Sequence, residues 1–334
     1  MSAPVRMGHV LRRAFDRGVH AAAQAMYSLP RNHPGRHGVR VVRDLPYLPT
    51  GLTSHLLDVY IPEDDLPQGQ LRPAVMYIHG GAFCMLSKDT HRVMALPFAK
   101  RGYVVFNVNY RLGPHNLYPS PLEDVTAALH WVLDNARSHG ADPNRLIIAG
   151  ESAGGNLVTA LTYLSTHPVE EPFARALFER NPPIKASIPI YGFLDLTHME
   201  RFLNRPRVPD WAKREVMTAA TSYLGKNVLE AAQKHPLASP LRLLESPAVQ
   251  GSRPLPPFFI ACGTADMLLD DSRRLKVALD KRGTPADLHV FHGEIHGFNA
   301  MVWRPAAKAK WRALFQFLRS VHMGPPAHQH HGHG

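Results

Sequence analysis

Residues 145–167 constrain the fold more than any other stretch of this chain. An apolar, β-rich run at 146–149 leads into Gly-Glu-Ser-Ala-Gly at 150–154, and a helical pattern follows at once. Ser152 therefore falls on a sharp turn between a strand and a helix, which is the backbone context of a nucleophilic serine.

The neighbours of this serine suit such a turn. Gly150 and Gly154 stand two residues before and two residues after it, where a Cβ atom would obstruct the turn. The N–H group of Ala153 lies at the predicted start of the helix, so it is able to face developing negative charge. The alternative is a glycine-rich connection without chemistry, because glycine and serine also dominate ordinary turns.

Composition places the chain among globular proteins. Its 334 residues suffice for one large domain. Hydrophobic residues make up 45% of the chain and charged residues 19%, a composition unlike that of a disordered or coiled-coil sequence. The formal net charge of +11 suggests a nucleic acid or a membrane as partner. The arginines are scattered along the chain with no basic run interleaved with aromatics, so we expect no nucleic-acid partner.

The two cysteines, Cys84 and Cys262, each follow a predicted core strand in apolar company. This placement favours buried free thiols over a disulfide framework and indicates a reducing compartment. The sequence shows neither a secretory signal pattern nor an apolar run long enough to span a membrane. We therefore expect a cytoplasmic protein.

Residues 7–26 form a predicted amphipathic helix. Its apolar side chains recur at helical spacing, opposite Arg12, Arg13 and Arg17. Our first interpretation is a helix that lies on the protein's own body. A weak membrane-surface contact or a targeting segment is the alternative.

The rest of the chain alternates between predicted strands and helices. Residues 39–44 and 56–61 alternate in polarity, so we expect two antiparallel strands at a sheet edge. Mainly apolar strand-like runs separated by helical patterns then predict right-handed βαβ units in a mainly parallel sheet, which is an α/β fold. These runs are 74–78, 103–108, 146–149, 184–190, 258–261 and 287–291. Functional loops are expected at the carboxyl ends of these strands.

The region 195–253 interrupts this alternation. It carries no strand signal and consists of short helical patterns broken by prolines, so we expect a helical cap over the functional edge of the sheet. The predicted organisation is an N-terminal helical segment that contributes to the cap, a core in two pieces, the cap insertion and a tail. These are residues 1–38, 39–194 with 254–322, 195–253 and 323–334, in that order.

The tail is rich in proline, glycine and histidine, which cannot form a core. Its histidines lack the acids, cysteines and ordered scaffold that would favour a metal site, so we expect a solvated tail and no metal. They are His328, His330, His331 and His333.

A serine hydroxyl is a weak nucleophile at neutral pH, so it needs a base and an acid that orients the base. We choose His296 as the base, because it follows the last predicted strand and precedes the last helix; His292 is the alternative nearer the strand. We choose Asp266 as the acid, because it comes directly after the penultimate strand. Asp270 is the alternative, and we expect it to be the N-cap of the following helix. The chain order serine, aspartate, histidine is the one that this sheet topology supplies.

Donors for an oxyanion are predicted after the 74–78 run, in His79-Gly80-Gly81-Ala82. Two adjacent glycines leave the backbone free of side chains, so a substrate oxygen can approach the N–H groups closely. We expect the N–H groups of Gly80, Gly81 and Ala153 to form the oxyanion hole together.

With these residues in place, the sequence resembles a known family. The motifs are HGGAF at 79–83, YRL at 110–112, Pro119 and Pro121 before Glu123-Asp124, GESAGGN at 150–156, Asp266, and His296-Gly297-Phe298. Over roughly residues 70–320 they resemble the hormone-sensitive-lipase-like branch of the α/β-hydrolases. The resemblance implies a carboxylesterase without cofactor, with Ser152, Asp266 and His296 as its triad. It also implies that the cap covers the acyl and alcohol pockets, and that Glu151 lies near the serine without a chemical step.

Ala82 departs from the family's usual pattern, in which a third glycine commonly stands at this place. Alanine fits a broader pattern associated with roomy alcohol pockets, so we expect esters of bulky alcohols to be accepted. The expected substrate is a small-molecule ester with a short-to-medium acyl chain. Both a monomer and a homo-oligomer are compatible with the sequence. Two rival interpretations are an amidase or formamidase with the same residues and a non-catalytic ligand-binding protein on this fold.

Overall fold

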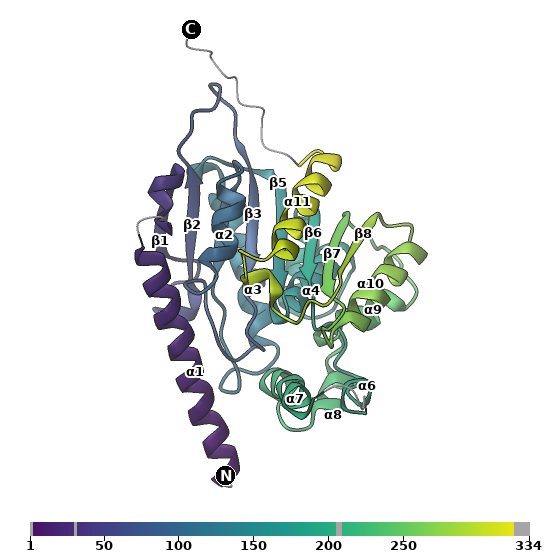
Figure 1. The fold of residues 1–334 in the computed structure, drawn as a ribbon. Coiled ribbons are helices and arrows are strands. Elements are labelled where there is room, and N and C mark those ends of the chain that lie inside the picture. The colour runs from purple at the N-terminus through teal and green to yellow at the C-terminus, as the bar shows by residue number, and fades with distance from the viewer. Residues whose placement is uncertain (1–2, 30–31, 205–208, 324–334) are drawn as a thin grey trace.

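The computed structural model describes residues 3–29, 32–204 and 209–323 (Figure 1). Within them, eight strands form one sheet in the order β1-β2-β4-β3-β5-β6-β7-β8. β2 is antiparallel to both β1 and β4, and all other neighbours are parallel. The strands are β1 Val39–Pro46, β2 Leu56–Pro62, β3 Arg72–Ile78, β4 Val104–Val108, β5 Ala141–Glu151, β6 Ile184–Ile190, β7 Phe258–Gly263 and β8 Ala286–Phe291. The antiparallel edge pair and the mainly parallel α/β sheet are therefore confirmed.

Helices cover both faces of the sheet, which explains why the central strands are continuous apolar runs. They are α1 Ala3–Ser28, α2 Arg92–Ala99, α3 Ser120–Asn135, α4 Ala153–Thr166, α5 Pro172–Arg180, α6 Glu200–Leu203, α7 Asp210–Leu224, α8 Val228–Lys234, α9 Pro240–Glu245, α10 Leu269–Lys281 and α11 Pro305–Ser320. Because side chains alternate across a strand, Met76 of β3 packs in the cluster that includes α3 and α4. Its neighbours Val75 and Tyr77 pack in the opposite cluster with α2 and α11.

The carboxyl ends of the parallel strands meet along one edge of the sheet. The chemistry-bearing residues of the sequence follow β3, β5, β7 and β8 at this edge. The parallel arrangement therefore gathers segments that are far apart in the chain.

The second half of α1 lies on the protein's own body. The Leu86 N–H donates to Asp16 Oδ1 over 2.8 Å, and the Tyr27 hydroxyl donates to the carbonyl of Thr90 over 3.0 Å. The amino end of α1 extends past the sheet (Figure 1). The side chains of residues 3–13 and of Phe15, which carry part of the predicted apolar face, lie outside what the structure describes. None of the described helices is both long and apolar enough to cross a bilayer.

The 195–253 insertion is helical, as expected, but it divides into two parts. Helices α6, α7 and α8 lie together beyond the carboxyl edge of the sheet (Figure 1). Helix α9 instead packs against α4 and α10, in the layer that covers the sheet. Helix α5, before β6, was not predicted and packs against α3 and α4. The four tail histidines lie outside the described residues.

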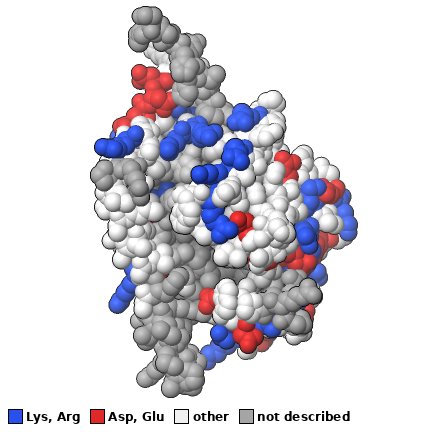
Figure 2. Space-filling view, in the orientation of Figure 1, with Lys and Arg blue, Asp and Glu red and all other residues white. Residues whose placement is uncertain are grey.

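Basic side chains that are scattered in the sequence gather on one surface of the fold. Lys308, Arg312 and Arg319 are exposed on α11, and the Arg101 guanidinium lies 4.7 Å from the ring centroid of Phe315. Neither α2 nor α11 contains an acidic residue. Figure 2 shows basic side chains over the region where these two helices lie. Part of the net positive charge is therefore concentrated on this face.

Candidate active site

Ser152 lies on the predicted sharp turn, between the end of β5 and the start of α4. Its backbone has φ 54° and ψ −116°, which is a strained conformation for a residue with a Cβ atom. A Cβ atom on Gly154 would overlap the carbonyl oxygen of Ile78, and one on Gly150 would crowd the same oxygen. Both glycines are therefore needed, and the nearest obstacle to a Cβ atom is the neighbouring strand β3 rather than the turn itself.

The structure brings the three predicted triad residues together. His296 Nε2 lies 2.9 Å from Ser152 Oγ, and His296 Nδ1 lies 2.8 Å from Asp266 Oδ2. The buried Asp266 also accepts the Leu268 N–H through Oδ1 over 2.8 Å. Because a carboxylate only accepts, we assign the imidazole proton to Nδ1, which leaves Nε2 to accept the serine hydroxyl.

The two rival residues lie outside this chain of contacts. His292 is exposed at the end of β8. Asp270 was expected to be the N-cap of the helix after β7, and this is wrong: Leu268 is the N-cap, and Asp270 lies in the first turn of α10. There it forms an ion pair with Arg201 over 3.2 Å. An acidic side chain in the first turn is favoured by the helix dipole without being the cap.

The electrostatics around His296 favour its protonated form. Burial is the largest single influence and lowers the pKa of His296, but the charge and hydrogen bond of Asp266, with a smaller contribution from Glu151, together outweigh it, so the pKa lies above the ordinary value of 6.5. The ring of Tyr191 contacts the imidazole edge-on, with centroids 4.8 Å apart. Such a site stabilises the imidazolium that forms when the histidine takes a proton from serine.

The loop after β3 corrects one predicted oxyanion donor. The Gly80 N–H donates to Glu151 Oε1 over 2.9 Å, so it is already occupied in the interior. Within the described residues, the N–H groups of Gly81, Ala82 and Ala153 have no backbone or side-chain acceptor. Gly81 and Ala82 both have positive φ, 113° and 52°, and this turns the backbone after Gly80. The N–H groups left open are therefore displaced by one residue from our expectation.

His79 supports this loop from within. Its ring is buried and stacks on Tyr110 with centroids 4.4 Å apart, while the Tyr110 hydroxyl donates to the His79 carbonyl over 3.0 Å. Burial lowers the pKa of His79 to about 3, so this ring is neutral at physiological pH. The histidine of the motif is therefore a structural residue of the loop.

Glu151 contacts a partner that the sequence did not suggest. Its Oε1 lies 2.6 Å from His91 Nε2 at the start of α2, and both side chains are buried. Burial raises the pKa of Glu151 to about 8 and lowers the pKa of His91 to about 4. His91 Nδ1 lies 3.0 Å from the Ser87 carbonyl, so Nδ1 carries the imidazole proton and Nε2 accepts one from Glu151. The pair is neutral and joins the serine turn, the Gly80 loop and α2.

A buried lysine anchors the following segment to the sheet. Lys88 Nζ lies 2.8 Å from Asp58 Oδ1 and 2.7 Å from Asp44 Oδ1, and the Asn107 side chain donates to the Lys88 carbonyl over 2.8 Å. Lys88 and Asp58 are both almost fully buried. The segment that carries the open N–H groups is therefore attached to β2 and β4 as well as to β5.

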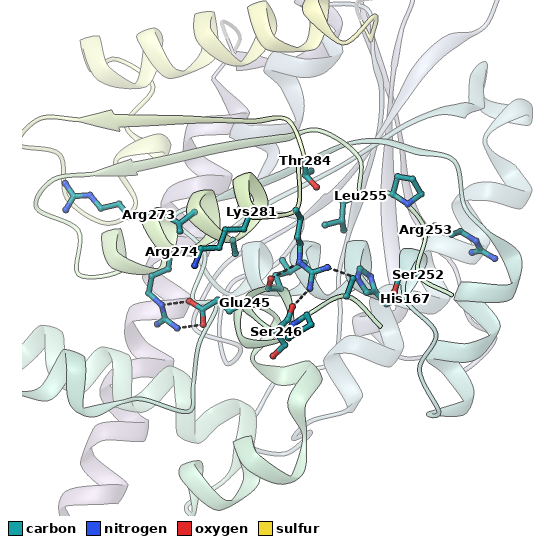
Figure 3. A pocket seen from close by; sticks show the side chains of 17 residues that line it. His167, Glu245, Ser246, Ser252, Arg253, Leu255, Arg273, Arg274, Lys281 and Thr284 are labelled. Carbon is teal, nitrogen blue, oxygen red and sulfur yellow. Dashed lines mark hydrogen bonds and ion pairs between the residues drawn. The ribbon is translucent and has the colours of Figure 1, made fainter. Parts of the chain in front are cut away.

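A cavity of about 830 Å³ lies away from these residues, between α9, α10 and the segment after α9 (Figure 3). Figure 3 shows Arg274 paired with Glu245 at one side of it. Arg282 donates to the carbonyls of Leu243, Leu244 and Ser246, so its guanidinium caps the carboxyl end of α9. Both arginines are therefore engaged in contacts within the fold, and we do not assign the cavity to catalysis. No cluster of three or more metal-ligating side chains occurs among residues 3–29, 32–204 and 209–323.

The geometry can be compared with known proteins. A family model described as an alpha/beta hydrolase fold matches residues 75–300. Carboxylesterase NlhH of Mycobacterium tuberculosis is 30% identical over 278 residues, which cover 81% of this chain and 80% of the relative. Arylacetamide deacetylase of Bos taurus is 28% identical and covers 79% of this chain and 76% of the relative.

Solved structures agree on the fold. Carboxyl esterase 2 of Tuber melanosporum is similar with a TM-score of 0.67 at 25% identity, over 85% of this chain and 87% of the other. Esterase LipW of Mycobacterium marinum is similar with a TM-score of 0.71 at 22% identity, over 94% of this chain and 89% of the other. The chain belongs to the α/β-hydrolase family, in the hormone-sensitive-lipase-like branch that its motifs resemble.

Proposed function

We propose that this protein is a serine carboxylesterase that hydrolyses small-molecule esters. The observation that carries the proposal is the chain of contacts from Ser152 Oγ through His296 to Asp266, at 2.9 and 2.8 Å. The names of the relatives, carboxylesterase NlhH among them, support the same activity.

The proposed reaction has two steps. Ser152 Oγ attacks the ester carbonyl while His296 takes the hydroxyl proton, and the histidine then gives this proton to the departing alcohol. This leaves an acyl-serine. Water loses a proton to His296 and attacks the acyl-serine, after which the proton returns to Ser152 and the acid leaves.

For the oxyanion we propose the N–H groups of Gly81, Ala82 and Ala153. The occupied N–H of Gly80 supports replacing it by Ala82. Ala153 stands at the start of α4, where backbone N–H groups have no partner within the helix and favour negative charge.

We propose that α6, α7 and α8, with the amino-terminal segment 1–38, form the cap over the substrate pockets. The place of α6, α7 and α8 beyond the carboxyl edge of the sheet supports this, as does the amino end of α1, which extends past the sheet on the same side (Figure 1). Helix α9 is better grouped with the core, because it packs against α4 and α10. Short-to-medium acyl chains and esters of bulky alcohols remain our proposed substrates. Turnover of a series of p-nitrophenyl esters from acetate to palmitate tests the acyl-chain length. Turnover of a tertiary-alcohol ester tests the acceptance of bulky alcohols.

Amide hydrolysis is the second candidate, because the same chemistry acts on either leaving group and one relative is named a deacetylase. Comparing p-nitrophenyl acetate with a matched anilide separates the two. We expect faster turnover of the ester, and loss of it in Ser152→Ala. Equal turnover by Ser152→Ala would contradict the proposed nucleophile, whereas absence of turnover in the wild type would favour a non-catalytic protein on this fold.

We also propose that the protein works in the cytoplasm. Within the described residues, Cys84 and Cys262 are not joined by a disulfide, which supports a reducing compartment. The contacts of Asp16 and Tyr27 support a helix α1 that lies on its own protein, over the weak membrane contact of residues 7–26. Flotation with lipid vesicles tests whether residues 7–26 bind a membrane surface. Sedimentation tests whether the protein forms a homo-oligomer.

A further inference from the structure

The loop with the proposed oxyanion donors contacts the insertion through one aromatic stack. Phe83 follows Ala82 directly, is fully buried and has φ 57°. Its ring lies against the ring of Tyr223 at the carboxyl end of α7, with centroids 3.9 Å apart and planes 1° from parallel. Tyr223 is also fully buried. The residue after the proposed donors is therefore covered by a side chain of the insertion.

Backbone contacts tie the same elements together. The Gly113 N–H donates to the Phe83 carbonyl over 2.8 Å, and the Tyr118 N–H donates to the Tyr223 carbonyl over 2.7 Å. A Cβ atom on Gly113 would overlap the Ser222 carbonyl, so this segment touches α7 directly. The loop, the 110–119 segment and the end of α7 form one packed unit.

The ring of Tyr223, and not its hydroxyl, makes the contact. Within the described residues the Tyr223 hydroxyl has no hydrogen-bond partner, although it is buried. Phenylalanine would therefore preserve every contact that tyrosine makes with the loop.

We propose that Tyr223 is a positioning residue that holds Phe83 and thereby aims the N–H groups of Gly81 and Ala82 at the oxyanion. This rests on the proposed function. Ala82 and Phe83 both hold positive φ, which non-glycine residues keep only where surrounding structure enforces it. Without the ring over Phe83 the loop can relax, and the donors would move from the place where charge develops.

The experiment compares Tyr223→Leu with Tyr223→Phe in the full chain. Loss of one oxyanion donor costs about 100- to 1000-fold in kcat, so a displaced loop should cost about 10- to 100-fold. We expect this loss in kcat for Tyr223→Leu, with KM within about threefold, because the donors act on the transition state. Tyr223→Phe should keep wild-type kcat. If Tyr223→Leu does not fold, Tyr223→Met replaces it, since methionine fills the volume without a flat face.

Tyr163→Leu is the matched control for loss of a buried ring. Tyr163 stacks on His167 with centroids 4.0 Å apart, at the carboxyl end of α4 and away from the loop. The Tyr163→Leu variant should have a lower melting temperature than the wild type and the same kcat. A kcat within twofold of wild type in folded Tyr223→Leu, or an equal kcat loss in Tyr163→Leu, would overturn the positioning role.

Failure of this proposal is distinct from failure of the proposed function. Ser152-dependent ester turnover with an unaffected Tyr223→Leu overturns only the role of Tyr223. Absence of Ser152-dependent turnover in the wild type overturns the esterase proposal itself.

Discussion

Asp266→Asn changes one atom of the proposed triad and tests its electrostatics. An asparagine amide would donate towards His296 Nδ1, which now donates to the carboxylate over 2.8 Å. The imidazole would then carry its proton on Nε2, facing Ser152, and could not accept the serine proton. We expect kcat/KM to fall about 10⁴-fold, which equals about 5.5 kcal/mol of transition-state stabilisation.

The pH dependence gives the same variant a second readout. Catalysis needs neutral His296, so kcat/KM of the wild type should fall as pH drops through a pKa above 6.5. The Asp266→Asn substitution would remove the charge that raises the pKa of His296 and leave burial, which lowers it. The acid limb of the residual activity should therefore move to lower pH.

The matched control is Asp270→Asn, the same substitution four residues along. Asp270 makes a partly exposed ion pair with Arg201, so kcat/KM should change less than twofold. Stopped assays of p-nitrophenyl ester hydrolysis from pH 5 to 9 measure both variants. A loss below tenfold in Asp266→Asn with an unmoved acid limb, or a large loss in Asp270→Asn, would refute the reasoning.

Three further substitutions test the supports of the site. Glu151→Ala removes the buried carboxyl that contacts the Gly80 N–H and His91 Nε2 and leaves both groups without it, so it should cost about 1–3 kcal/mol in urea unfolding together with a lower kcat; unchanged stability would contradict the pairing. Gly154→Ala should abolish activity and reduce folded yield, because its Cβ would overlap the Ile78 carbonyl, and an active variant would sink that argument. Lys88→Met leaves the Asp58 carboxylate buried without its cation and should lower the free energy of unfolding by about 3–5 kcal/mol, whereas a loss under 1 kcal/mol would show that the pair contributes little.

Local pattern predicted the sheet well, because strands buried on both faces appear as continuous apolar runs. It also predicted the serine turn from Gly150 and Gly154, although the atom nearest to a Cβ at either glycine is the Ile78 carbonyl oxygen of β3, which the local pattern does not show. Asp266 and His296 could be chosen because chain order and strand ends restrict where the acid and base can stand.

What the sequence could not show depends on contacts between distant segments. The direction of the Gly80 N–H follows from the side chain of Glu151 on another strand, so the open N–H groups of this loop begin one residue later than we expected. The contact of Glu151 with His91 is of the same kind, since neither position carries a local signal. The separation of α9 from the rest of the insertion is likewise set by packing against α4 and α10.

The central claim is that Ser152 is the nucleophile, and an organophosphate tests it most directly. After reaction of the full chain, peptide mapping by mass spectrometry should find one adduct, on Ser152, in proportion to lost esterase activity. The adduct should be absent in Ser152→Ala and slow to form in Asp266→Asn. An unmodified Ser152 in folded, inactivated protein would contradict the account.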